Sequence, residues 1–370
     1  MTRIHAGFVL LLAGAIARPV RAQPRAAPAP PPAWSPHAAA AYLDSRMGWW
    51  LTWQTAARDH DTSCISCHTA LPYALARPAL RAPLAERGPA APEQRMLDNV
   101  VKRVRLWKDV EPFYPDQTRG LPKTSESRGT EAVLNALILA SRDAATGALS
   151  EDARLAFANL WALQFRAGDQ KGGWAWLNFH NEPWEANGSP YFGAALAAIA
   201  VGRAPGGYAS SPEIRDQLKL LREYLQRGAD TTSLFNRAMV LWASAQLPGM
   251  LAQATHQAIV DALLAAQRED GGWSTASLGT YKRGDGTPLD ERSDGLAAGM
   301  ATFALQRAGL PRAEAHVHRG VAWLEQHQDA KSGMWLASSL NKARDPATDI
   351  GKFMSDAATA YAVLALTYAP

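Results

Sequence analysis

The sequence has few cysteines and, beyond its N-terminus, no long apolar run. Cys64 and Cys67 are the only cysteines among 370 residues, which excludes a disulfide-rich scaffold. No stretch approaches the roughly 18 apolar residues of a membrane-spanning helix. Neither a Gly-x-Ser-x-Gly elbow nor a glycine-rich phosphate loop after a strand occurs. We therefore expect no transmembrane segment in the mature chain.

The N-terminus has the pattern of an export signal. Arg3 precedes an apolar stretch over 6–17, and the Val-Arg-Ala step at 20–22 matches a small-x-small cleavage site. This pattern predicts a signal peptide over 1–22, followed by a proline- and alanine-rich tether over 23–33. We expect an exported protein, located in the periplasm.

The net charge argues against nucleic acid as a partner. The full chain carries +4 at pH 7, but Arg3, Arg18 and Arg21 fall within the predicted signal, where no acidic residue stands. The mature chain would carry about +1. Such a weak charge gives no reason to expect binding to nucleic acid.

Both cysteines stand in the stretch DTSCISCHTALP, as Cys-x-x-Cys-His. A covalent c-type haem needs two thiols for its two vinyl groups and an adjacent imidazole as axial iron ligand, an order that Cys64, Cys67 and His68 fit. A disulfide or redox thiol pair is the main alternative in an oxidising compartment. A zinc site is the third, with His60 as the further ligand nearby. We predict one covalent haem c, with His68 on its iron.

The sixth iron ligand is less well defined by the sequence. Met47, Met96, His37 and His60 are the nearby candidates, and we name Met96 or Met47 as the ligand if the position is filled. A filled position suits electron transfer, whereas an open one lets iron bind peroxide, O2 or another small ligand. The haem-binding segment is expected over 34–90.

Residues 95–370 alternate apolar helical periods with loops rich in Gly, Pro and Asp, and they contain no convincing strands. Ala-rich helices with almost no polar face are predicted to start at serine N-caps: Ser127, Ser189, Ser233, Ser293 and Ser355. A more amphipathic helix precedes each one. These five pairs predict an all-α fold, in which buried inner helices and amphipathic outer helices close into an α/α toroid.

Three amphipathic helices end in a glutamine that is followed by glycine and tryptophan. The pairs are Gln164 with Trp174, Gln267 with Trp273 and Gln328 with Trp335. Glycine permits the turn, the amide ties off helix ends, and the indole packs on the next hairpin. We interpret these pairs as staples of a structural repeat.

The stretch RGVAWLEQHQDAKSGMW, residues 319–335, resembles the QW motif of squalene-hopene cyclases, and LLAAQREDGGW is a shorter version of the same pattern. Residues 95–370 are similar to the repeat architecture of the squalene cyclase and protein prenyltransferase superfamily. The resemblance implies an α/α barrel with a central, largely apolar, aromatic-lined cavity. An isoprenoid-like ligand would suit such a cavity.

The chain lacks the catalytic acid motif and the zinc ligands of these families. The resemblance would call for the Asp-x-Asp-Asp acid of the cyclases, and no such run occurs. The weak candidates for an acid are Asp290, Asp294, Asp356 and Glu131. The zinc-binding Asp, Cys and His of the prenyltransferases have no counterpart, because both cysteines precede the repeats.

Further residues are candidates to lie near the inner face of the toroid. The polar ones are Glu182, Glu185 and Lys352, and the aromatic ones are Trp176, Trp184, Tyr191 and Tyr281. Capping or solvation of loops is the plainer explanation of each of these residues.

Three functions are compatible with these features. The first, which we expect, is a monohaem c-type cytochrome-like redox protein whose toroid binds an apolar isoprenoid-like ligand or docks a periplasmic electron donor or acceptor. The second is a terpenoid cyclase-like enzyme without the usual acid motif. The third is a scaffold for a hydrophobic ligand, without catalysis, in which Cys64 and Cys67 form a disulfide.

Overall fold

The computed structural model describes Thr2 and residues 34–369, and residues 34–369 belong to one compact unit. The predicted signal peptide and tether fall outside the described residues, apart from Thr2. Helices dominate residues 34–369, where the named strands are the short antiparallel pair β1 (Ala57–Arg58) and β2 (Thr62–Ser63). The prediction of an all-α fold is confirmed. Within these residues, no helix is both long and apolar enough to cross a membrane.

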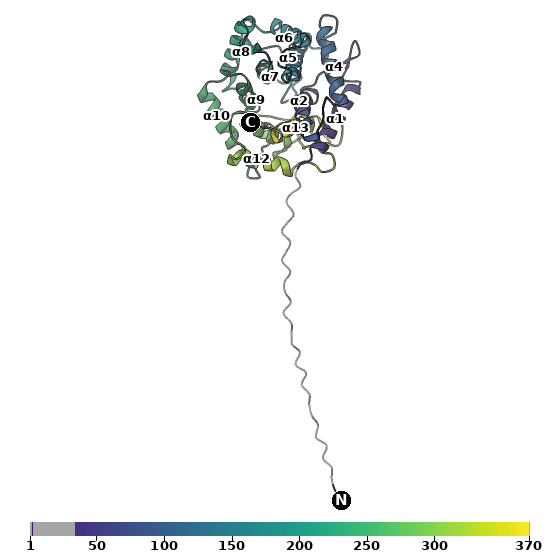
Figure 1. The fold of residues 1–370 in the computed structure, drawn as a ribbon, viewed down its shortest axis with the longest axis vertical. Coiled ribbons are helices and arrows are strands. Elements are labelled where there is room, and N and C mark those ends of the chain that lie inside the picture. The colour runs from purple at the N-terminus through teal and green to yellow at the C-terminus, as the bar shows by residue number, and fades with distance from the viewer. Residues whose placement is uncertain (1, 3–33, 370) are drawn as a thin grey trace. The chain divides into compact units, whose positions relative to one another are not determined.

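Six helices form an inner ring of contacts. They are α2 (Ala70–Ala76), α5 (Thr124–Asp143), α7 (Ser189–Arg203), α9 (Leu234–Gln246), α11 (Gly295–Arg307) and α13 (Phe353–Leu366). Each packs on the next in this order, and α13 returns to pack on α2 (Figure 1). The helices α5, α7, α11 and α13 are buried over most of their length, as their apolar sequences require.

Further helices pack around the outside of the ring (Figure 1). They are α1 (Pro36–Thr52), α4 (Ala91–Arg105), α6 (Glu151–Ala162), α8 (Arg215–Gly228), α10 (Gln253–Ala265) and α12 (Ala315–Gln326). In α8 only Leu218, Leu221 and Leu225 are buried, and they recur at helical spacing. One face of α8 therefore meets the ring while the other meets water.

Small residues allow the inner helices to approach closely. A Cβ added at Gly299 of α11 would lie 2.6 Å from the backbone nitrogen of Ala362 in α13. Real Cβ atoms do not approach other atoms that closely, so Gly299 cannot become alanine without moving α13. The alanine-rich composition of these helices therefore reflects tight helix packing.

The prediction that serines cap the inner helices is correct only for Ser233, which precedes α9 and accepts a hydrogen bond from Asn236 N. Asp294 caps α11 instead. Ser127 and Ser355 lie inside the first turns of α5 and α13, and their hydroxyls bond the backbone of Tyr114 and Ala337. These serines therefore hold the preceding loop against the helix.

The glutamine and tryptophan staples have the same geometry at all three places. Each indole is fully buried and donates to a carbonyl of its own outer helix, with Trp174, Trp273 and Trp335 bonding Leu160, Leu263 and Leu324 at 2.7–2.8 Å. Each glutamine amide donates once within its own loop and once to the start of the next outer helix. The interpretation as structural staples is confirmed.

The third staple joins the two ends of the repeat. Gln328 follows α12, and its amide donates to the carbonyl of Ser35 at 3.1 Å and accepts from Ser35 N at 2.6 Å. Ser35 is the N-cap of α1. The next outer helix after α12 is therefore α1, so α1 and α2 act as a sixth helical pair. Residues 34–90 and 95–369 belong to one compact unit.

Candidate functional site

The Cys-x-x-Cys-His stretch lies at a pocket beside the N-terminal ends of the inner helices. The pocket is open to solvent and has a cavity volume of about 220 Å³. Its wall comes from the end of α1, the start of α13 and the loops that precede α2, α5, α7 and α13. It includes Cys64, Ser66, His68, Trp50, Trp53, Tyr114, Phe179, Trp184, Phe353 and Met354. Loops far apart in the sequence therefore surround the motif with aromatic side chains.

Both thiols are free and buried. Burial raises the pKa of Cys64 to about 12, and it raises the pKa of Cys67 as well. The two groups are therefore neutral thiols at physiological pH, and they are not joined in a disulfide. Cys64 lines the pocket, whereas Cys67 is buried beside it and does not.

The ring of His68 is held between aromatic side chains. Phe353 stacks on it with centroids 3.9 Å apart, and Trp50 meets it edge-on at 5.2 Å. Burial, with a smaller effect from Arg46, lowers the pKa of His68 to about 3. The imidazole is therefore neutral, the form that binds metals.

Asp356 receives hydrogen bonds on both of its carboxylate oxygens. Oδ1 accepts from the Tyr42 hydroxyl at 2.8 Å and from Arg46 Nε at 2.7 Å. Oδ2 accepts from Arg46 Nη2 at 3.1 Å and from the Thr69 hydroxyl at 2.6 Å. Burial raises the pKa of Asp356 above its usual value, and these donors, led by Arg46, favour its anion and offset part of that rise.

This carboxylate sets the tautomer of His68 through Thr69. The Thr69 hydroxyl has one proton, which it donates to Asp356, so it can only accept from His68 Nδ1 at 2.9 Å. Nδ1 therefore carries the imidazole proton, and the lone pair of Nε2 is left for a ligand. This is the support that a metal-binding histidine receives from groups behind it.

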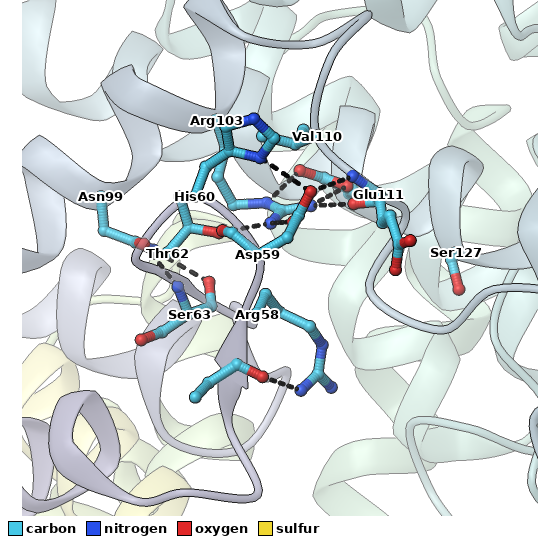
Figure 2. Close-up of polar contacts among 12 residues, drawn as sticks. Arg58, Asp59, His60, Thr62, Ser63, Asn99, Arg103, Val110, Glu111 and Ser127 are labelled. Carbon is cyan, nitrogen blue, oxygen red and sulfur yellow. Dashed lines mark hydrogen bonds and ion pairs between the residues drawn. The ribbon is translucent and has the colours of Figure 1, made fainter.

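Polar contacts with α4 and α5 anchor the hairpin before Cys64 (Figure 2). The Asn99 side chain accepts from Ser63 N at 2.7 Å and donates to Ser63 O at 3.0 Å. Arg103 donates to the Thr62 hydroxyl at 2.7 Å and pairs with Glu131, and both charged groups are fully buried. The backbone that presents Cys64 is therefore fixed on the packed helices.

Two further bonds continue this support through the motif itself. Trp50 Nε1 donates to the carbonyl of Cys64 at 2.7 Å. The Ser66 hydroxyl accepts from the backbone nitrogens of Thr69 and Ala70 at 3.2 and 3.0 Å, which satisfies the start of α2. The turn from Cys64 to His68 is therefore held from both sides.

None of the four predicted acids lines this pocket. Glu131 is paired with Arg103, and Asp356 is bonded as described above. Asp294 caps α11 by accepting from Leu296 N and Ala297 N. The hydrogen bond from Arg292 lowers the pKa of Asp290 to about 2, too low for a proton donor near neutral pH. Each acid therefore has a structural partner.

The expected methionines do not lie at the pocket. Met47 and Met96 are 1% exposed in the core, and neither is among the residues lining the pocket. Met354, at the start of α13, does line it. We chose Met47 and Met96 because they are close to the motif in sequence. Met354 is distant in sequence and reaches the pocket because α13 packs on α2. His60 bonds Asp59 at 2.9 Å, remains half exposed and does not line the pocket (Figure 2).

Charged residues also line the pocket. Burial raises the pKa of Glu185 to about 7, and it raises the pKa of Glu182 as well. Arg119 and Arg344 also line the pocket. The sequence pointed to Glu182, Glu185 and Trp184, but no local pattern singled out these arginines, which lie in irregular loops.

Residues 34–369 offer no ligand set for binding a metal ion directly, without haem. No group of three or more His, Cys, Asp or Glu residues there could hold a metal ion. The zinc alternative is therefore without a ligand set in the described part of the chain.

Comparison with known proteins concerns the fold alone. No protein-family model matches the chain. No curated protein matches it at a significant level. A solved polysaccharide lyase structure aligns with a TM-score of 0.52, covering 90% of this chain and 96% of that chain at 11% sequence identity. The chain is thus similar to that lyase in backbone arrangement.

Proposed function

We propose that the chain is an exported c-type haem protein with redox function. Cys64 and Cys67 would bond the haem, and His68 Nε2 would ligate its iron. The observation that carries the proposal is the hydrogen-bond chain from His68 Nδ1 through Thr69 to Asp356, beside two free thiols. This chain leaves Nε2 to the iron. A haem bound there would supply an iron that gains and loses one electron.

The pocket offers surface for both the apolar ring and the carboxylate side groups of a haem. Trp50, Trp184 and Phe353 provide apolar surface around His68. Arg119 and Arg344 also line the pocket, and their positive charge would pair with the carboxylate side groups of the haem. The open side of the pocket gives a small molecule or a redox partner access to the site.

For the body of the protein we propose an α/α toroid of the squalene cyclase type. The closed ring of inner helices, the surrounding outer helices and the three staples support this arrangement. Its ligand would be an apolar, isoprenoid-like molecule, and its partner a periplasmic electron donor or acceptor.

An absorption spectrum tests the haem proposal. The full chain would be exported by a host that attaches haem c, and read oxidised and dithionite-reduced. We expect a Soret band and a sharp reduced α-band that stay with the denatured polypeptide and vanish in Cys64→Ala with Cys67→Ala. His68→Ala should alter the spectrum and His60→Ala should not. A folded, colourless wild-type protein would refute the proposal.

A proton-transfer enzyme is the second candidate, and Glu185 favours it. A carboxyl group with a pKa of about 7 in an open pocket is suited to general acid–base chemistry. The cyclase-like alternative would have to use this group, because the four acids predicted from the sequence are bonded elsewhere. A colourless protein that converts a polyprenyl substrate, and loses that activity in Glu185→Gln, would favour this candidate.

A further inference from the structure

A second cleft opens where the inner helices end. It shares no lining residue with the motif pocket, opens to solvent and has a cavity volume of about 780 Å³. The last turns of α5, α7, α11 and α13 contribute Ser141, Arg142, Arg203, Arg307 and Leu364 to its wall. Neither the proposed haem nor the staples account for this cleft.

Two half-buried arginines face this cleft without a carboxylate partner in residues 34–369. Arg203 ends α7, and its Nε is buried with no hydrogen bond. Arg307 ends α11, lies 5.5 Å from the centre of the Tyr368 ring, and donates to the amide oxygen of Gln246 in the orientation that satisfies both groups. The hydroxyl of Ser141 in the same wall is also buried without a partner.

Among residues 34–369, the acids near the cleft already accept hydrogen bonds. Glu93 bonds Arg81, Asp143 bonds Arg142, and Asp98 accepts from Gln94. Burial, followed by the charge of Arg307, lowers the pKa of Arg203. The carboxyl ends of α7 and α11 offset part of this positive charge, but a helix end supplies only about half an elementary charge.

Unpaired buried donors are rare in native proteins and need an acceptor. The apolar part of the same wall comes from Leu75, Ile138, Phe303 and Leu364. An acceptor that also covers this surface is an anion with an apolar tail.

We infer that this cleft binds an amphiphile with a carboxylate or phosphate headgroup, held by Arg203 and Arg307, with its tail along Ile138, Phe303 and Leu364. The site is independent of the haem proposal, because the two pockets share no residue. Planar guanidinium groups suit either headgroup, since both offer two oxygens to the donor fork.

Calorimetric titration of the full-length secreted protein with three probes tests the inference. Decanoate and decyl phosphate, below their micelle concentrations, carry the two headgroups, and decanol carries none. We expect at least one anionic probe to bind, with decanol binding at least tenfold more weakly. Binding of decanoate alone identifies a carboxylate site, and binding of decyl phosphate alone identifies a phosphate site.

Matched arginine variants locate the site. Arg203→Met and Arg307→Met should weaken the anionic probe by about ten- to a hundredfold. Arg222→Met is the control, because Arg222 also has a buried, unpaired Nε but lies on α8, outside the cleft. If a methionine variant fails to fold, Arg203→Lys replaces it, because lysine keeps the positive charge but lacks the two-donor fork of the guanidinium group. Equal binding of decanol, or unchanged binding in both cleft variants, would overturn the inference.

Discussion

At the scale of single residues, the tautomer of His68 is the feature on which the proposed site depends. Thr69→Val removes the acceptor of Nδ1–H with little change of shape, so the preference for the Nδ1–H form should fall by about two- to tenfold. Nitrogen-15 NMR of full-length Cys64→Ser, Cys67→Ser protein measures this without haem, and Thr69→Ser is the control. An Nε2–H form in the unsubstituted background would contradict the account.

Glu185 gives a second prediction at this scale, on stability against pH. Its folded pKa of about 7 lies above the ordinary value of 4.5, so the folded state binds the proton more tightly. This contribution is present below pH 4.5 and is lost as pH rises through 7, by up to about 3 kcal/mol. In the same haem-free background, Glu185→Gln should therefore gain unfolding free energy relative to its parent between pH 5 and 8. A difference that stays constant with pH would exclude the raised pKa.

At the scale of elements, Gln328 joins α12 to α1 by the same contacts that Gln267 makes inside the chain. Gln328→Ala should cost about 1–2 kcal/mol in urea unfolding and raise hydrogen exchange in α1. Gln267→Ala is the matched control, with a similar cost but no change in α1. Unaltered exchange of α1 in Gln328→Ala would mean that this staple does not hold the ring closed.

The helices themselves were largely predictable from the sequence. The amphipathic stretches that begin at 93, 153, 213, 256 and 318 all lie on outer helices, because periodicity of apolar residues is a local signal. The serine caps were less predictable. Ser127 and Ser355 bond loops rather than helix ends, and such a choice depends on tertiary contacts that no local pattern records.

At the scale of the whole molecule, closure of the ring creates the site. Asp356 and Thr69 are 287 residues apart in sequence but 2.6 Å apart between their oxygens. The sequence contains the Cys-x-x-Cys-His motif, and we named Asp356 from it as a candidate acid. The structure places Asp356 behind His68 instead. Three features follow from contacts between distant loops and helix ends, which sequence spacing does not reveal. They are the role of Asp356 behind His68, the position of Met354 at the pocket, and the positions of the arginines in both clefts.

Mass spectrometry of the peptide that contains DTSCISCHTALP tests the central claim most directly. The secreted protein would be produced with haem attachment, denatured, extracted with acid acetone and digested. We predict that this peptide carries the mass of one haem, and that the haem is absent in Cys64→Ala with Cys67→Ala. An unmodified peptide, or one that carries only a Cys64–Cys67 disulfide, would contradict it.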